Sequence, residues 1–342
     1  MKMTLFRVDL PLRHTVGVAR ESTCVVRSLI VRLEQDGLYG YGEAAESQYY
    51  NVPVEESQEL LAEIREEIEE YTLADPVAFW GAMAPHLESN RFAQCALDVA
   101  ACDLWGKMRE KPLYKLWGYG KKVPPESSYT VSVDTPDFMI AKMKDQAGWP
   151  SYKIKVGGED AVNVVRELRQ HTNAAFRVDA TGTWTPDQTV KHSEELKALN
   201  VEFIEQPLPP GDWEGMRYVH ARSALPIMAD ESCATEADLD QCASVFDGVN
   251  VKLVKCGGLT PARRMLRRAA KWGLKTMAGC MVESTVASSA MAQLAPIADY
   301  LDLDGTLFVD KTVADGILLE RGRIIYPAEN GTGVTLRKRV AV

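Results

Sequence analysis

The chain of 342 residues can bury a large core, which predicts one large domain or a large domain with a small one. Its net charge of −9 argues against nucleic acid or an anionic membrane as a partner. No apolar run approaches the ~20 residues of a membrane span and the N-terminus has no signal-peptide pattern, so we expect a cytoplasmic protein.

The first part of the chain has strand patterns followed by helical patterns. We expect strands at 1–15 and 29–45, and helices at 54–71 and 91–108. The dipeptide Asp36-Gly37 predicts a hairpin turn within the second strand segment. An antiparallel sheet followed by helices indicates a small α+β unit.

From about residue 125, short strand-like runs alternate with helical patterns at nearly constant spacing. The runs are 127–133, 151–156, 174–180, 201–207, 225–231, 248–255, 274–280 and 299–305. Thr185-Pro186 and Thr260-Pro261 each place a capping residue before a proline, which predicts helix starts. Such a series predicts an α/β fold of the (β/α) barrel type rather than an open sheet. No Gly-x-Gly-x-x-Gly follows the first run, which disfavours a dinucleotide-binding fold.

Cysteine and histidine do not point to a metal site. The cysteines are scattered and never spaced Cys-x-x-Cys, which is typical of reduced thiols rather than of zinc ligands or disulfides. The histidines show no ligand spacing either. Any metal would therefore be a hard ion such as Mg²⁺, held by oxygen ligands.

Charged residues recur at the C-terminal ends of the barrel runs, where barrel enzymes build their sites. They are Lys153, Lys155, Asp179, Glu205, Asp230, Glu231, Lys252, Asp302 and Asp304. Asp179, Glu205 and Asp230 come from three consecutive units and would repel one another unless a divalent, oxygen-binding ion lay between them. Their repetition disfavours the alternative that they are solvated loop carboxylates.

The lysines complement these carboxylates. Lys153 and Lys155 share one face of their strand, because side chains two residues apart point the same way. Lys252 lies on the opposite side of the barrel. A lysine beside a divalent cation has its pKa lowered, so one amine can act as a general base and its counterpart as a general acid. These parts suit abstraction of a proton α to a carboxylate, with the metal stabilising the enediolate.

The ordered segments KIKVG, VDATGTW, IEQPL, ADES, VNVKLVKCGGLT and DLDG resemble the muconate-lactonizing subgroup of the enolase superfamily. The segment ALDVAACDLWGK is also similar, so the resemblance covers essentially the whole chain. It implies an α+β capping domain, made of residues 1–122 and 313–342, over a modified (β/α)7β TIM-type barrel of residues 123–312. We also expect one Mg²⁺ per subunit and a homo-oligomer.

The resemblance also implies individual roles. By position, Asp179, Glu205 and Asp230 are metal ligands. Lys155 and Lys252 form the acid/base pair, and Lys153 supports the charge of the enediolate. Lys255 lies outside the catalytic pair. Two further acids, Glu231 and Glu283, are expected to surround the ligands without binding the ion.

The subgroup includes cycloisomerases, o-succinylbenzoate synthases, N-acylamino acid racemases and dipeptide epimerases. In dipeptide epimerases an Asp-x-Asp motif, here Asp302 and Asp304, receives the α-ammonium group of the dipeptide. We therefore expect epimerisation at the α-carbon of the C-terminal residue of a dipeptide by two-base 1,1-proton transfer. The other three activities remain as alternatives on the same lysines and metal. Alternatively, Asp302 and Asp304 belong to a turn that ends the strand and binds no ligand.

Loops of the capping domain are expected to set specificity for the substrate side chain. The resemblance implies that Arg20 would meet a distal carboxylate, unless the adjacent Glu21 occupies that place. Glu46 would favour a cationic side chain, and Tyr49 with Tyr50 would pack an apolar one. Each is alternatively an ordinary surface residue.

Overall fold

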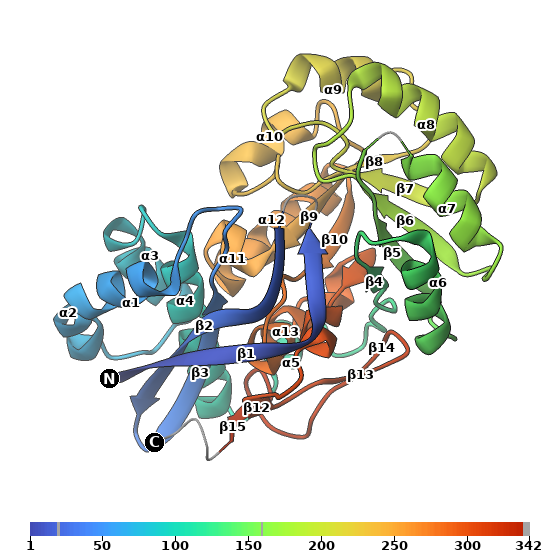
Figure 1. The fold of residues 1–342 in the computed structure, drawn as a ribbon. Helices are drawn as coiled ribbons and strands as arrows, with labels where there is room; N and C mark the ends of the chain where they lie inside the picture. Colours follow the sequence, from blue (N-terminus) through green and yellow to red (C-terminus); the bar gives the residue numbers. More distant parts are fainter. Residues whose placement is uncertain (19–20, 159, 338–342) are drawn as a thin grey trace.

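The computed structural model describes residues 1–18, 21–158 and 160–337, without the side chains of residues 14–23. Two main sheets organise this part of the chain, and Figure 1 shows the N-terminal sheet in blue and the second sheet in green to orange. The N-terminal sheet has three antiparallel strands, and the second has eight parallel strands in chain order. The predicted α/β barrel and α+β unit are both confirmed.

The N-terminal sheet consists of β1 (Lys2–Val18), β2 (Glu21–Gln35) and β3 (Leu38–Ala45). Asp36 and Gly37 have φ values of 53° and 76° and form the predicted two-residue turn between β2 and β3. β3 packs against α4 (Arg91–Met108), the helix predicted at those residues. The two elements approach closely, since a Cβ on Gly42 would lie 2.0 Å from the carbonyl oxygen of Ala96.

The single helix predicted at 54–71 is wrong, because two helices occupy these residues. The helices of this region besides α4 are α1 (Val54–Glu63), α2 (Arg65–Glu70), α3 (Pro76–Met83), η1 (Ala84–His86) and α5 (Leu113–Leu116). Ile64, with φ −98° and ψ 21°, separates α1 from α2. Beyond it, Arg65 donates to the Met3 carbonyl (2.7 Å) and the Met3 amide donates to Glu69 (3.0 Å). This docking of α2 against β1 accounts for the break.

Each predicted barrel run contains one strand of the second sheet. The strands are β4 (Tyr129–Val131), β5 (Ser151–Lys155), β6 (Ala175–Asp179), β7 (Val201–Glu205), β8 (Ile227–Ala229), β9 (Gly248–Lys252), β10 (Lys275–Gly279) and β11 (Tyr300–Asp302). The seam, where β11 meets β4, is joined by a parallel bridge between Ser127 and Leu301. There the Ser128 amide donates to the Leu301 carbonyl at 3.0 Å.

Helices alternate with these strands, as the sequence predicts. They are α6 (Pro136–Asp145), α7 (Ala161–Arg169), α8 (Pro186–Ala198), α9 (Trp213–His220), η2 (Glu236–Asp238), α10 (Leu239–Cys242), α11 (Leu253–Cys256), α12 (Leu259–Lys271), α13 (Thr285–Ala292), η3 (Ala295–Ile297) and η4 (Asp304–Phe308). Thr185 caps α8 as predicted. Thr260 does not cap α12, which begins one residue earlier after Gly258. Instead, Thr260 donates its amide (2.8 Å) and its hydroxyl (2.7 Å) to Asp98 of α4.

The inward faces of the strands form layers inside the barrel. An apolar cluster of Phe203, Met228 and Met277, with Tyr300 packed against it, forms the floor. Phe203 lies two residues before Glu205, and Met228 lies two residues before Asp230. Side chains alternate along a strand, so each apolar side chain points the same way as the charged one that follows it. The apolar floor therefore supports a layer of charged side chains at the C-terminal ends of the strands.

Three buried carboxylates join the N-terminal region to the rest of the chain. Glu43 of β3 accepts the amides of Ser284 and Ala287, each at 3.0 Å, at the start of α13. Asp98 meets the first turn of α12, as described above, and Asp103 accepts the Thr332 amide at 2.7 Å. Two of these carboxylates lie at helix N-termini, where amides without an intrahelical partner favour an anion.

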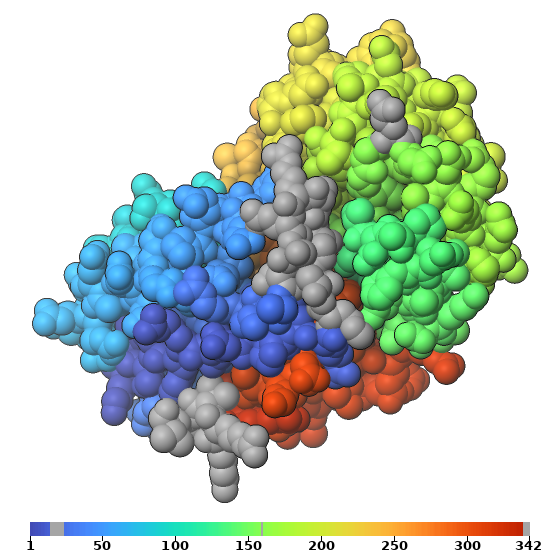
Figure 2. All heavy atoms as spheres, in the orientation of Figure 1, coloured from blue at the N-terminus to red at the C-terminus, as the bar shows by residue number. Residues whose placement is uncertain are grey.

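The described part of the C-terminal segment contains four short strands that pair with one another in two antiparallel two-stranded sheets. They are β12 (Ala314–Asp315), β13 (Leu318–Glu320), β14 (Arg323–Ile325) and β15 (Thr335–Leu336). Figure 2 shows blue N-terminal residues directly against red C-terminal ones, and Leu12 forms an antiparallel bridge with Val309. The boundaries at residues 122 and 312 stay a prediction. Within the described residues, no helix has the length and apolar character needed to cross a membrane.

Candidate active site

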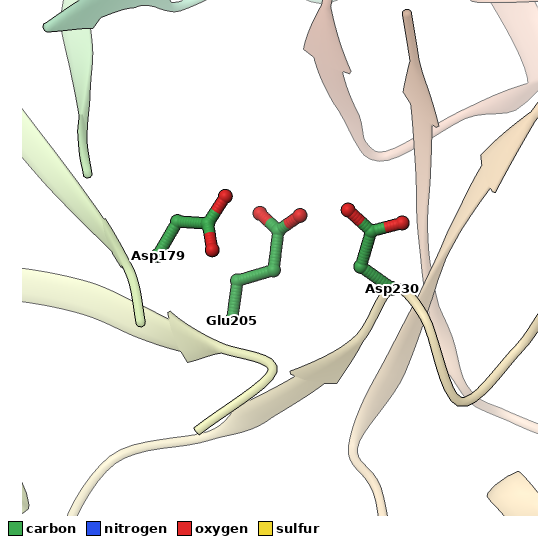
Figure 3. Close-up of side chains that lie close together, drawn as sticks. All are labelled: Asp179, Glu205 and Asp230. Atoms are coloured by element: carbon green, nitrogen blue, oxygen red, sulfur yellow. The ribbon is translucent and has the colours of Figure 1, made fainter. Parts of the chain in front are cut away.

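Three carboxylates meet at the C-terminal ends of β6, β7 and β8. Figure 3 shows Asp179, Glu205 and Asp230 in a row, with their carboxyl groups turned toward the same space. Each offers one oxygen, and these oxygens lie within 4.8 Å of one another. All three side chains are buried. The predicted ligand set is therefore brought together.

The pairing of the strands produces this arrangement. Asp179 lies opposite Glu205 in the register of β6 and β7, and Lys155 lies opposite Asp179 in the register of β5 and β6. Asp230 directly follows β8. The ends of adjacent parallel strands thus place these side chains at one level of the barrel.

Glu205 shows that the site fits a cation. Its Oε1 accepts hydrogen bonds from Lys153 and from the side-chain amide of Asn250, both at 2.9 Å. Its buried Oε2 has no hydrogen-bond partner among the described residues. Burial raises the pKa of Glu205 to about 8, against the opposing effect of Lys153. A buried carboxylate oxygen without a partner is costly, and a hard divalent ion would remove that cost.

Lys153 lies at the centre of the charged layer and is almost completely buried. Its Nζ lies 2.9 Å from Glu205 Oε1, 2.9 Å from Asp302 Oδ2 and 3.2 Å from Asp179 Oδ2. Burial opposes its charge, but Asp302 and Glu205 hold the pKa of Lys153 well above its ordinary value. The group is therefore a fixed cation, consistent with a supporting role.

Lys155 and Lys252 stand at the two ends of the carboxylate row. Lys155 Nζ lies 3.0 Å from Asp179 Oδ2, and Lys252 Nζ lies 2.7 Å from Asp230 Oδ2. Burial lowers the pKa of Lys252, but Asp230 outweighs burial and holds it well above the ordinary value. The lowered lysine pKa expected from the sequence therefore requires a cation bound beside the lysine.

Two further acids, Glu231 and Glu283, lie close enough to Lys252 for its charge to act on them, and their predicted role around the ligands stays a prediction. Burial raises the pKa of Glu231 to about 7, with a further contribution from Asp230. Burial also raises the pKa of Glu283 to about 8, with a further contribution from Glu43. Glu231 Oε2 is another buried oxygen without a partner among the described residues.

Asp302 and Asp304 are brought together by Thr130 of β4. The Thr130 hydroxyl lies 3.3 Å from Asp302 Oδ1 and 3.2 Å from Asp304 Oδ1, and its amide donates to Asp304 Oδ2. Burial raises the pKa of Asp304 to about 8, and Asp302 adds to the rise. The two carboxylates therefore repel, and an incoming cationic group would relieve that repulsion.

The predicted specificity residues lie in different surroundings. Arg20 lies outside the described residues. Glu46 is held by Arg27 at 2.7 Å, and Tyr49 is 56% exposed. Tyr50 is partly buried instead, and burial together with the charge of Asp230 raises its pKa. The roles assigned to Arg20, Glu46 and Tyr49 stay predictions.

Sequence reasoning missed two residues that hold the ligands. Asn250, described above, lies two residues before Lys252 on the same face of β9, which was an available signal. Gln206 follows Glu205 with φ 39° and accepts the amides of Asp230 (3.0 Å) and Ser232 (3.1 Å). Its position in IEQPL was visible, but its contacts with the end of the next strand were not.

Comparisons with known proteins show the family of the chain. The family model for the mandelate racemase/muconate lactonizing enzyme N-terminal domain matches residues 1–118, and the enolase C-terminal domain-like model matches residues 139–340. An L-Ala-D/L-amino acid epimerase of Flavobacterium johnsoniae is 46% identical over 336 residues, which cover 98% of this chain and 100% of that protein.

Two solved structures are similar over nearly the whole chain. The L-Ala-D/L-Glu epimerase of Bacillus subtilis, in a complex with substrate, has a TM-score of 0.93 at 28% identity, covering 98% of this chain and 99% of that chain. The dipeptide epimerase of Enterococcus faecalis, in a complex with Mg and L-Leu-L-Tyr, has a TM-score of 0.91 at 28% identity and the same coverage of both chains.

Proposed function

The chain belongs to the mandelate racemase/muconate lactonizing enzyme family of the enolase superfamily, and on that premise we propose that it is a Mg²⁺-dependent dipeptide epimerase. This isomerase would invert the α-carbon of the C-terminal residue of a dipeptide. The observation that carries the proposal is the pair Lys155 and Lys252 at opposite ends of a row of three buried carboxylates.

Asp179, Glu205 and Asp230 are the residues that would hold the ion. A divalent cation bound there would stabilise the negative charge that develops on the substrate carboxylate as the α-proton leaves. Glu205 Oε2, which lacks a partner among the described residues, is available for this purpose. Lys153 contributes a fixed positive charge beside the same carboxylates.

The two lysines at the ends of the row would exchange the proton. In one direction Lys155 removes the α-proton from one face of the substrate, and Lys252 delivers a proton to the other face. In the reverse direction their roles are exchanged. Inversion requires a proton donor on each side of the α-carbon, and lysines held by different carboxylates, Asp179 and Asp230, supply that arrangement.

Asp302 and Asp304 would receive the α-ammonium group of the dipeptide. Their mutual repulsion and their burial favour a cationic group over an anionic one. Muconate and succinylbenzoate carry no such cation and would add to the repulsion. The name of the Flavobacterium relative makes dipeptides with an N-terminal L-alanine the first substrates to test.

A dipeptide library in D₂O with Mg²⁺ tests the proposal. The L-Ala-L-Xaa members are expected to gain one deuterium at the α-carbon of Xaa, detected by mass spectrometry, and to yield the D-Xaa epimer on chiral chromatography. Lys155→Ala and Lys252→Ala should each abolish inversion. Lys197→Ala, on the exposed surface of α8, is the matched control and should retain activity.

N-succinyl amino acids in a parallel reaction separate the epimerase from an N-acylamino acid racemase. Exchange on these compounds without exchange on any dipeptide would refute the dipeptide proposal. Exchange on dipeptides that is selectively reduced in Asp302→Asn would support the ammonium site. N-acyl substrates lack the ammonium group and should not show the same loss.

A further inference from the structure

Lys255 is a buried cation that the proposed proton transfer does not use. None of its side-chain surface is exposed. Its Nζ lies 2.6 Å from Asp230 Oδ1 and 3.0 Å from the carbonyl oxygen of Asn250, and it also donates to the Asp230 carbonyl. An ammonium group has three N–H donors, and all three have acceptors here.

The backbone around Lys255 is held firmly in place. The residue lies in α11, a short helix between β9 and α12 that ends at Cys256 and is capped by Gly257. Gly257 and Gly258 have φ values of 91° and 122°, and a Cβ on Gly258 would lie 2.4 Å from Asp98 Oδ2 of α4. Any larger residue at Gly258 would collide with α4. The turn that carries Lys255 is therefore fixed against the N-terminal region.

The two oxygens of Asp230 are bound by different lysines. Lys255 holds Oδ1 at 2.6 Å, and Lys252 holds Oδ2 at 2.7 Å. Lys252 must reach the α-carbon of the substrate during the proposed reaction. Lys255 has no route to the substrate, because its side chain is enclosed and all its donors are occupied.

We propose that Lys255 is a positioning residue that orients the Asp230 carboxylate for the metal ion while Lys252 serves the substrate. This inference rests on the proposed function. The two lysines of the KLVK segment then have different roles. The first acts on the substrate, and the second fixes a metal ligand. Loss of a group that orients a metal ligand typically weakens metal binding or activity by ~10–100-fold.

A purely electrostatic role would have the opposite effect on metal affinity. Lys255 is a positive charge close to a cation site, so its removal would relieve repulsion and strengthen binding. Positioning instead predicts weaker binding, because the freed carboxylate can leave its place in the ligand set. The direction of the change in metal affinity therefore distinguishes the two roles.

The test measures Mn²⁺ binding by electron paramagnetic resonance on the full chain. The variants are Lys255→Met, Lys255→Gln and Lys252→Met, each first shown to be folded by circular dichroism. Lys255→Met is expected to raise the Kd for Mn²⁺ by ~10–100-fold, and Lys255→Gln, which keeps a neutral donor, by a smaller factor. Lys252→Met, the matched change on the same carboxylate, should bind Mn²⁺ no more weakly than the unsubstituted chain.

Activity provides a second readout. At saturating Mn²⁺, Lys255→Met should recover most of its turnover, whereas Lys252→Met should not epimerise at any metal concentration. A role in fold stability alone would leave the metal dependence of activity unchanged.

Each failure has a separate meaning. If the unsubstituted chain binds no Mn²⁺, the proposed function itself fails. If it binds Mn²⁺ and Lys255→Met binds equally or more tightly, only the positioning inference is overturned. If Lys255→Met does not fold, unchanged Mn²⁺ affinity in Lys255→Gln overturns the inference in the same way.

Discussion

Replacing Glu43 by glutamine should destabilise the chain strongly, although the residue lies outside the catalytic constellation. The Glu43 carboxylate accepts hydrogen bonds from the hydroxyl of Ser28 (2.8 Å) and from the amides of Ser284 and Ala287 (3.0 Å each). Glutamine has nearly the same shape but only one accepting oxygen. One amide at the start of α13 would therefore lose its acceptor.

The size of the effect follows from these contacts. A buried amide left without an acceptor costs ~1–3 kcal/mol. Loss of a negative charge at a helix N-terminus costs a further ~0.3–2 kcal/mol. We therefore expect the free energy of unfolding to fall by ~1.3–5 kcal/mol in Glu43→Gln.

Urea denaturation at neutral pH, followed by circular dichroism, measures this change. Glu46→Gln is the control, because Glu46 lies three residues further along and forms a partly exposed ion pair with Arg27. Such pairs contribute only ~0–1 kcal/mol. Equal, small losses in the two variants would refute the reasoning that the buried carboxylate caps α13.

The remaining predictions concern metal and pH. Asn250→Leu, which removes a donor from Glu205, should weaken Mn²⁺ binding ~10-fold with an unchanged circular dichroism spectrum, and unaltered affinity would contradict this role. Chelation by EDTA should abolish deuterium exchange, and added Mg²⁺ should restore it; exchange that persists without metal would exclude the proposed chemistry. Burial raises the pKa of Asp98 from 3.8 to about 7. The folded chain then binds more protons than the unfolded chain between these values, so this group lowers stability as pH rises through that window. Asp98→Asn should remove that part of the slope in urea titrations, and an unchanged slope would contradict the shift.

The local and repeating features of the fold could be predicted from sequence. Alternation and spacing located every barrel strand, because a buried parallel strand between turns has a distinctive pattern. The turn at Asp36-Gly37 and the cap at Thr185 were also predictable, since each depends on residues close together in the chain. The row formed by Asp179, Glu205 and Asp230 followed from strand periodicity alone.

Features decided by distant residues could not be predicted in this way. Thr260 precedes a proline, as helix-capping residues often do. In the structure its amide instead donates a hydrogen bond to Asp98, which is far away in the chain. The strand pattern places Asn250 on the same face as Lys252, but only the folded barrel brings its amide against Glu205.

The seam of the barrel has a consequence for the order of events during synthesis. Lys153 comes from the second barrel strand, but one of its carboxylate partners, Asp302, comes from the last. Thr332, which pairs with Asp103 of α4, lies later still. The charged layer is therefore complete only when nearly the whole chain has left the ribosome. Domains generally fold as units during synthesis, so a truncated chain would carry lysines and carboxylates without their counterions. These unpaired charges would destabilise the truncated chain, which favours its degradation over its folding.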